Sequence, residues 1–160
     1  MQGLKVNKMN ECDSKFIAYA KEVSRQSKDP SKQVGAVIVD RDNQIISSGY
    51  NDFPRGITGD KYMYSDRDVK TKYIIHAEAN AIYDALDRGK SVAGSTIYVS
   101  TLSTCHECAK SIIQTGITRV VCPTIKPESR WAASCQLASR LFTQCNIEVC
   151  YYDTNPKELY

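Results

Sequence analysis

Two short motifs contain the residues best suited to chemistry. His76-Ala77-Glu78 begins one apolar-periodic segment, and Cys105-His106-Glu107-Cys108 begins the next. A zinc ion with three nitrogen and sulfur ligands keeps its fourth position for water, which is typical of a catalytic site rather than a structural one. The spacing therefore predicts a catalytic zinc site with His76, Cys105 and Cys108 as ligands. Glu78, two residues after the first ligand, is the candidate group for acid and base catalysis beside such a metal.

The motifs also have simpler explanations. A lone C-x-x-C can be a redox pair or half of a structural zinc site. A structural site needs a fourth ligand, and His106 is the nearby candidate. Because His106 lies between the two Cys of a short motif, we expect it to point away from the metal. A zinc-stabilised binding module stays as the non-enzymatic alternative, although it has no chemical use for Glu78. Glu107 is expected to be only a helix N-terminal charge.

Composition narrows the class of protein. The chain has 160 residues, 42% of them apolar and 24% charged, with a net charge of +3. These values predict a single globular domain over residues 1–160. The nearly balanced charge gives no reason to expect a nucleic-acid groove. No apolar run is long enough to span a membrane, and residues 1–10 contain no hydrophobic signal core, so we expect a cytoplasmic protein.

The sequence holds seven cysteines, two of them in the metal motif. In the absence of a secretion signal, the other five are expected to be free thiols that pack as small hydrophobic residues. They are Cys12, Cys122, Cys135, Cys145 and Cys150. A second metal site built partly from them is the alternative.

Apolar periodicity predicts alternating helices and strands. Helices are expected at Asp13–Gln26, from His76 to about Arg88, from Cys105 to near Gly116, and at Trp131–Gln144. Strands are expected at Val34–Val39, Ile45–Tyr50, Thr96–Ser100, Arg119–Cys122 and Ile147–Tyr152. The first two strands form a hairpin. Residues 51–73 show no clean period, and a loop of this length is usually functional or mobile.

The helix predicted at Trp131–Gln144 decides the direction of the last strand. We expect Leu137 and Leu141, together with Trp131 and Ser134, to face inward. Strands separated by a helix normally lie parallel, because the crossover brings the chain back to its starting edge. The last strand is therefore predicted to be parallel to its neighbour in an α/β fold with a five-stranded mixed sheet.

From Asp29 to Tyr152 the chain resembles the zinc-dependent cytidine and deoxycytidylate deaminase superfamily. The similarity to deoxycytidylate (dCMP) deaminases rests on residues 29–36 (DPSKQVGA), 49–56 (GYNDFPRG), 76–82 (HAEANAI) and 105–110 (CHECAK). The resemblance implies a three-layer α-β-α fold and hydrolysis of dCMP to dUMP and ammonia, which supplies thymidylate synthesis. It also implies a homo-oligomer, with a hexamer favoured.

The resemblance assigns roles to particular residues. His76, Cys105 and Cys108 would hold zinc, and Glu78 would be the proton shuttle. Asn51 matches a position that contacts the deoxyribose, and the alternative is a turn residue that ends the second strand. The backbone of Ala77 would lie against the base. For the phosphate we expect a clamp from the basic loop, with Arg55 first and Lys32 behind it.

Two positions depart from the family pattern. Thr104 stands where the family usually has Pro before the first zinc Cys. Asp52 stands where many dCMP deaminases have Gly, in a stretch tied to activation by dCTP and inhibition by dTTP. A carboxylate facing a triphosphate is unfavourable unless Mg²⁺ intervenes, so this change weakens the expectation of these effectors.

Other deaminases remain as alternatives. One is an enzyme acting on a free nucleoside, a nucleobase or a modified cytosine nucleotide. Nucleoside cytidine deaminases typically lack a helix before the last strand, so the predicted helix at Trp131–Gln144 counts against them. Another is a tRNA adenosine deaminase, which would be expected to have a more basic surface and a shorter loop after the second strand.

Overall fold

The computed structural model describes residues 8–154, and residues 1–7 and 155–160 lie outside the described part. The cytoplasmic expectation was drawn partly from residues 1–10, and most of these lie outside the described residues. The helices are α1 (Glu11–Ser24), α2 (Lys61–Ser65), α3 (Arg67–Tyr73), α4 (Ala77–Asp87), α5 (His106–Gln114) and α6 (Ala132–Gln144). The strands are β1 (Gly35–Val39), β2 (Ile45–Tyr50), β3 (Thr96–Val99), β4 (Arg119–Pro123) and β5 (Glu148–Tyr152). Among the described residues, no helix has the length and apolarity of a membrane span.

These strands form one mixed sheet in the order β2-β1-β3-β4-β5. β1 is antiparallel to β2 and to β3. β3, β4 and β5 run parallel, with Thr96 opposite Arg119 and Val121 opposite Cys150. A helix separates β3 from β4 and β4 from β5, so each crossover returns the chain to the same edge. The predicted fold class and the parallel last strand are confirmed.

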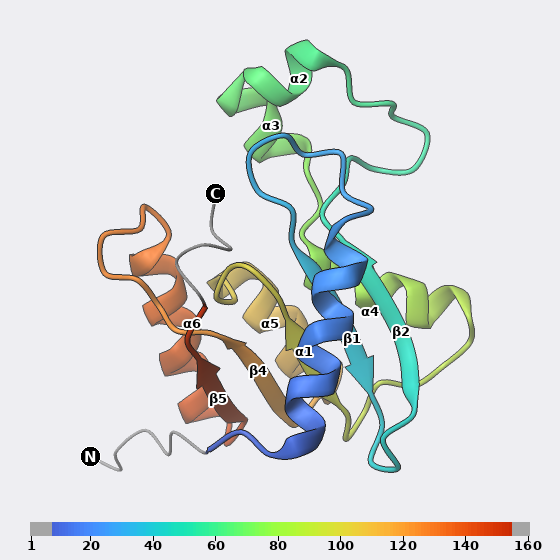
Figure 1. Ribbon diagram of the computed structural model, residues 1–160, viewed down its shortest axis with the longest axis vertical. Helices are drawn as coiled ribbons and strands as arrows, with labels where there is room; N and C mark the ends of the chain where they lie inside the picture. Colours follow the sequence, from blue (N-terminus) through green and yellow to red (C-terminus); the bar gives the residue numbers. More distant parts are fainter. Residues whose placement is uncertain (1–7, 155–160) are drawn as a thin grey trace.

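Hydrophobic cores on both faces of the sheet produce three layers (Figure 1). α1 covers one face, and α4, α5 and α6 cover the other. Successive residues of β1 alternate between the two cores: Ala36 and Ile38 face α4 to α6, whereas Val37 and Val39 face α1. Since both faces are covered, β1 is buried along its whole length.

A buried ion pair joins α1 to the sheet. Asp13 is fully buried and accepts hydrogen bonds from both terminal nitrogens of Arg119, at 2.7 and 2.9 Å, and from the Tyr98 hydroxyl at 2.9 Å. Burial by itself would raise the pKa of Asp13, but the bonds from Arg119, Asn10 and Tyr98 outweigh it and hold the pKa below its ordinary value. Asn10 and Asp13 also form a capping box, which begins α1 two residues before the predicted start.

Some side-chain predictions are wrong. Leu137 is 37% exposed, because the inner face of α6 is built from smaller residues and Phe142. α6 begins at Ala132, so Trp131 is its N-cap and not part of the helix. Of the five extra cysteines, Cys12 and Cys145 are exposed and do not pack as hydrophobic residues. Cys122, Cys135 and Cys150 are buried, as expected, and no disulfide joins the described cysteines.

The segment between β2 and α4 is not the continuous loop that periodicity indicated. It contains α2 and α3, which are capped by the side chains of Asp60 and Asp66. Neither helix contains a buried residue, so neither has the apolar stripe by which a helix is recognised in a sequence. The two helices project beyond the end of the sheet at the side of the molecule where α4 begins (Figure 1).

Two glycines allow helices to lie directly on the strands. A Cβ at Gly35 would lie 2.0 Å from the backbone oxygen of Ala20 on α1. A Cβ at Gly49 would lie 2.2 Å from the backbone nitrogen of Ala81 on α4. Such separations are far below van der Waals contact, so a side chain at either position would force the helix away from the sheet.

Candidate active site

The start of α4 brings His76 and Glu78 to one end of the sheet. His76 is the N-cap residue and makes no capping bond with its side chain, which leaves the imidazole available. Glu78, in the first turn, is only 5% exposed. Asn80 fixes the helix laterally, since its amide donates to the backbone oxygen of Tyr50 on β2 at 2.8 Å. The position of the first turn is therefore set by β2 and by the absence of a side chain at Gly49.

The start of α5 brings both motif cysteines to the same place. Cys105 is the N-cap, and its sulfur accepts a hydrogen bond from the backbone N–H of Cys108. His76 Nδ1 lies 3.4 Å from Cys105 Sγ and 3.4 Å from Cys108 Sγ. The three candidate ligand atoms all lie within 4.8 Å of one another. Two helix starts far apart in the chain thus converge on one point.

This donor set fits zinc. Tetrahedral zinc with ordinary Zn–N and Zn–S bonds separates neighbouring nitrogen and sulfur ligands by about 3.6 Å, close to the separations found here. The hydrogen bond from Cys108, together with the one from His76, lowers the pKa of Cys105 to about 4. The pKa of His76 rises to about 9, chiefly through its hydrogen bond with Cys105. The site thus stabilises a thiolate, and a metal ion would replace the protons that the donors share.

Burial dominates the electrostatics of Glu78. Removal from water raises the pKa of this carboxyl, although the nearby charge of His76 opposes the rise. The raised pKa means that the carboxyl of Glu78 holds a proton more readily than an exposed glutamate does. Glu107, in contrast, is exposed and pairs with Lys110, with Nζ 2.8 Å from the carboxylate. Its position agrees with a helix N-terminal charge.

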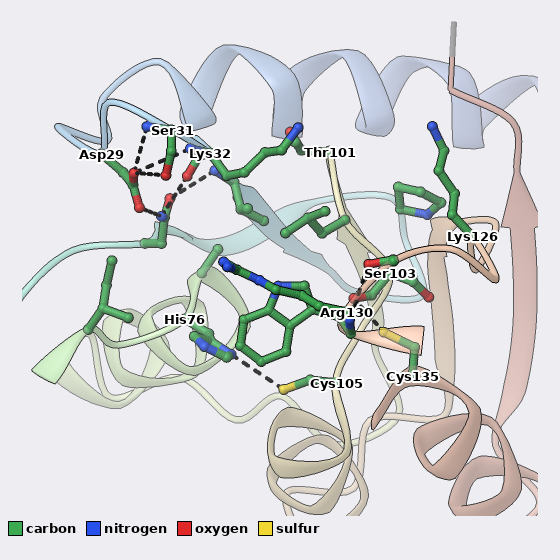
Figure 2. A pocket seen from close by; sticks show the side chains of 18 of the residues that line it. Asp29, Ser31, Lys32, His76, Thr101, Ser103, Cys105, Lys126, Arg130 and Cys135 are labelled. Carbon is green, nitrogen blue, oxygen red and sulfur yellow. Dashed lines mark hydrogen bonds between the residues drawn. The ribbon is translucent and has the colours of Figure 1, made fainter. Parts of the chain in front are cut away.

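The ligand trio lies at a cavity of about 480 Å³, within the range of small-molecule sites (Figure 2). Its lining includes Asn51, His76, Ala77, Glu78 and Cys105 from the predicted set, whereas Cys108 is not part of the lining. Trp131 and Tyr64 add aromatic surface. Cationic side chains also line the cavity, namely Lys32, Arg67, Lys70, Lys126 and Arg130.

Asn51 is held firmly by the surrounding backbone. Its Oδ1 accepts from the backbone N–H of Val34 at 2.8 Å, and its Nδ2 donates to the backbone oxygen of Lys32 at 2.9 Å and to Asp29 at 3.3 Å. Both amide hydrogens are therefore used within the protein, and a ligand could still use the second lone pair of Oδ1. In this structure Asn51 shapes the cavity wall, which is more than the role of a turn residue.

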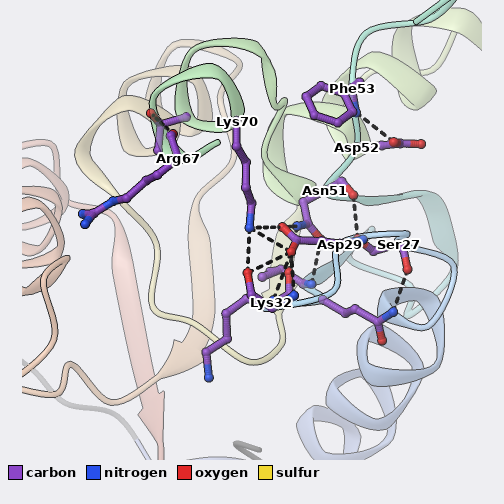
Figure 3. Close-up of polar contacts among 12 residues, drawn as sticks. Ser27, Asp29, Lys32, Asn51, Asp52, Phe53, Arg67 and Lys70 are labelled. Atoms are coloured by element: carbon purple, nitrogen blue, oxygen red, sulfur yellow. Dashed lines mark hydrogen bonds and ion pairs between the residues drawn. The ribbon is translucent and has the colours of Figure 1, made fainter. Parts of the chain in front are cut away.

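An ion pair between two lining residues connects the α2–α3 segment to this wall. Lys70 on α3 donates to Asp29 at 2.8 Å and to the Ser31 hydroxyl at 2.7 Å (Figure 3). Asp29 also accepts from the backbone N–H groups of Ser31 and Lys32. Burial would raise the pKa of Asp29, but these bonds outweigh it and hold the pKa below its ordinary value.

Arg55 is not among the residues that line this cavity, so its expected role as the first phosphate ligand stays a prediction. Its guanidinium pairs with Asp87 at the end of α4, and its side chain is 87% exposed. Arg55 lies in a turn that is closed by a hydrogen bond from the backbone N–H of Ile57 to the carbonyl oxygen of Pro54 at 2.9 Å. Arg67, on the unpredicted helix α3, supplies a cation at the cavity in its place, and Lys32 lines the cavity as expected.

Several lining residues were missed from the sequence. Among them, Arg67 lies in the segment without periodicity, Lys126 lies in the loop between β4 and α6, and Trp131 was assigned as the inward-facing first residue of a helix. The adjacent Arg130 and Trp131 at the start of a predicted helix were the one signal available, because residues before a helix often line a site at the carboxyl ends of parallel strands.

The chain belongs to the cytidine and deoxycytidylate deaminase family. The model of the family's zinc-binding region matches residues 10–124, which include both motifs. The chain is therefore an enzyme of a hydrolase family, and the His/Cys/Cys cluster lies within the region that matches the family's zinc-binding region.

Individual relatives agree with this family. An uncharacterised deaminase of Aliivibrio fischeri is 40% identical over 139 residues, covering 86% of this chain and 90% of that protein. Human deoxycytidylate deaminase is 41% identical over 111 residues, covering 66% of this chain. This chain spans 61% of the human protein and 57% of a probable deoxycytidylate deaminase of Drosophila melanogaster. The dCMP deaminase of cyanophage S-TIM5, solved with dCMP and dUMP, has the same fold, with a TM-score of 0.71 and 23% identity over 91% of this chain and all of that one.

Proposed function

We propose that this protein is a zinc-dependent dCMP deaminase, which hydrolyses dCMP to dUMP and ammonia and so supplies thymidylate synthesis. The observation that carries the proposal is the convergence of His76, Cys105 and Cys108 beside the buried Glu78 in a cavity of nucleotide size. The relatives named as deoxycytidylate deaminases support the choice of substrate.

Zinc held by the two motifs would supply hydroxide near neutral pH. Glu78 removes the proton from the attacking water and delivers it to N3 of the pyrimidine. The carboxylate then takes the second proton of the former water from the hydroxyl now bonded to C4 and gives it to the amine, which leaves as ammonia, so that a single carboxylate serves as base and as acid in turn. The burial that raises the pKa of Glu78 suits a group that must carry a proton between these atoms. The backbone of Ala77 lines the cavity beside Glu78, and in this proposal it lies against the base.

Cations from two separate elements line the cavity and support a preference for a nucleotide. Arg67 comes from α3, and Lys126 and Arg130 come from the loop between β4 and α6. Arg67 and Lys126 make no ion pair within residues 8–154. A phosphate between such groups gains charge-assisted hydrogen bonds without first breaking an internal pair. These two residues replace Arg55 in the proposed clamp.

Assembly into a closed homo-oligomer, with a hexamer favoured, is also proposed. Tyr83 and Leu86 leave an apolar strip on the outer side of α4, with exposures of 51% and 73%. Asp52 does not argue for a nucleotide effector, since its carboxylate accepts from the backbone N–H of Phe53 and is a poor neighbour for a triphosphate. Sedimentation at micromolar concentration tests the assembly, and a monomer alone would contradict it.

Ammonia release from four substrates tests the function. The zinc-loaded protein is incubated with dCMP, deoxycytidine, dCTP and a cytosine-bearing oligonucleotide. We expect dCMP to be preferred by a large factor, because a site built around one phosphate leaves its cations unpaired with a nucleoside. Equal activity on dCMP and deoxycytidine would instead favour a nucleoside deaminase. Release from the oligonucleotide alone would favour a polynucleotide deaminase.

A further inference from the structure

Trp131 is a large aromatic residue that the fold itself hardly uses. It is the only tryptophan of the chain, and it lies outside both hydrophobic cores. It is the N-cap of α6, yet its side chain makes no capping bond. The indole N–H donates to no group in the described part of the chain. The indole is half-buried, yet it neither packs in a hydrophobic core nor caps the helix with its side chain. Its position therefore suggests contact with a ligand.

The indole lies next to the reacting end of the cavity. Its ring centroid is 6.4 Å from that of His76, and the two planes are nearly perpendicular at 86°. Trp131 lines the same cavity as His76, Ala77 and Glu78. Any planar ring whose amino-bearing carbon reaches the ligand trio must therefore lie beside this indole. The separation falls within the 4.5–7 Å over which aromatic rings attract one another.

The neighbouring residue holds the indole in place. The guanidinium of Arg130 lies over the Trp131 ring, 5.3 Å from its centroid, in a cation–π arrangement. The backbone N–H of Trp131 also donates to the Ser129 hydroxyl at 3.2 Å. Tyr64, the other aromatic residue of the lining, packs on Phe53 with a centroid separation of 4.9 Å and is thereby committed to the α2 side. Trp131 is thus an aromatic residue of the lining that Arg130 orients by contact with its ring and that remains half-buried beside the cavity.

We infer that Trp131 is a specificity-determining residue that forms the aromatic wall against which the pyrimidine ring of the substrate packs. This inference rests on the proposed function, because it assigns a contact to the base of the same cytosine nucleotide. Arg130 keeps the indole in the orientation needed for that contact. Trp131 then binds the π-surface of the base, and other residues of the cavity bind the phosphate.

The single tryptophan provides a direct binding test. Zinc-loaded Glu78→Gln protein, which should bind dCMP without turning it over, is titrated while the tryptophan emission is recorded. We expect a saturable change with dCMP and a clearly smaller one with 2-deoxyribose 5-phosphate, which has the phosphate but no base. Equilibrium dialysis with dCMP in the same samples establishes that the nucleotide is bound. Bound dCMP with unchanged emission, or equal changes with both ligands, would overturn the inference.

Variants separate an aromatic contact from general packing. Trp131→Ala should raise the KM for dCMP about 10-fold, with a smaller change in kcat, since it removes an aromatic contact and its buried area. Trp131→Phe should restore most of the affinity, whereas Trp131→Leu, which restores apolar volume only, should not. Zinc content and the thermal transition should stay unchanged in all three. Equal KM values for the Phe and Leu variants would contradict the inference.

The two proposals fail in different ways. Turnover of dCMP by the unmodified enzyme, combined with unchanged emission and an unchanged KM in Trp131→Ala, removes the role of Trp131 and leaves the function intact. A lack of turnover on dCMP removes the proposed function, and the assignment of Trp131 falls with it.

Discussion

The ammonium of Lys70 lies 2.7 Å from the carboxylate of Asp29, and the two side chains are 15% and 2% exposed. Lys70 belongs to α3, and Asp29 lies in the turn that precedes β1. Because Asp29 also accepts from the amide of Asn51, this pair connects the projecting α2–α3 segment to the cavity wall. The pair thus ties the segment to the residues that line the site.

Replacing Lys70 with Ala should loosen that connection. The change leaves Asp29 buried without its partner, and breaking a buried pair costs about 3 kcal/mol or more. We expect a lower free energy of unfolding in urea and a raised KM for dCMP. Lys72→Ala, an exposed lysine on the same helix, is the matched control and should stay within about 0.5 kcal/mol of the unmodified protein. Equal stability of the two variants would contradict the importance of the pair.

The Asp13–Arg119 pair should make the metal-free protein sensitive to acid. The pKa of Asp13 in the folded protein lies below its unfolded value of 3.8, so the folded state favours the ionised carboxyl. The resulting stability is fully present above that unfolded value and is lost as the pH falls through the folded pKa. Urea unfolding of metal-free protein across this range should show the loss. Asp13→Asn should be less stable at neutral pH and should have a flatter dependence below about pH 4.

Cys105→Ala should abolish zinc binding. The variant removes one of three converging ligands, so we expect loss of bound metal and of activity, together with a lower thermal transition. The metal content is measured after dialysis against a weak chelator. Cys145→Ala, which replaces an exposed cysteine outside the cluster, should keep about one zinc per chain. Stoichiometric zinc in Cys105→Ala would refute the ligand assignment.

Glu78→Gln should separate chemistry from metal binding. The amide keeps the size of the side chain but can no longer accept and release the proton, so turnover should fall at least ~100-fold. Zinc content and the thermal transition should remain those of the unmodified protein. Glu107→Gln changes an exposed glutamate beside the same cluster and should leave kcat unaltered. Near-normal turnover by Glu78→Gln would mean that another group carries the protons.

Arg67→Ala and Lys126→Ala should each narrow the preference for dCMP over deoxycytidine. A charge-assisted contact with a phosphate contributes about 1.5–3 kcal/mol, so we expect kcat/KM for dCMP to fall roughly 10- to 100-fold. Turnover of deoxycytidine should change little, since it has no phosphate to lose. Arg55→Ala is the control, because Arg55 is exposed and pairs with Asp87 outside the cavity. A larger effect at Arg55 than at Arg67 would restore the clamp expected from the sequence.

Local chemistry explains which predictions succeeded. The ligand trio could be predicted because each motif lies at the start of a helix, where spacing alone decides which side chains share a face. The parallel last strand followed from the helix before it. The choice between Arg55 and Arg67 could not be made, because it depends on the path of the α2–α3 segment. That path is set by the Lys70–Asp29 contact, which joins residues 41 positions apart.

The exact start of α6 at Trp131 could not be predicted from the sequence either. A start of α6 one residue later turns a predicted core side chain into part of the cavity wall. Leu137 was assigned inward by periodicity, but Ala132, Cys135 and Ala138 form a narrow inner face that brings α6 close to its neighbours. Packing of small residues against other helices decided this orientation, and the sequence pattern of α6 alone does not contain that information.

The bare backbone of Gly49 beneath α4 has a consequence for how this enzyme can vary. The first turn of α4 holds Glu78 and follows His76, so its height above β2 sets where both groups stand relative to Cys105. One added methyl group at position 49 would lift the helix and misalign the proton carrier and the metal ligand together, although it touches neither. Cationic groups around the opening can be exchanged to suit other substrates. Position 49 on β2, in contrast, tolerates no larger residue, because a side chain there would collide with the backbone of α4. Substitutions that abolish activity can therefore occur at a position that does not contact the substrate.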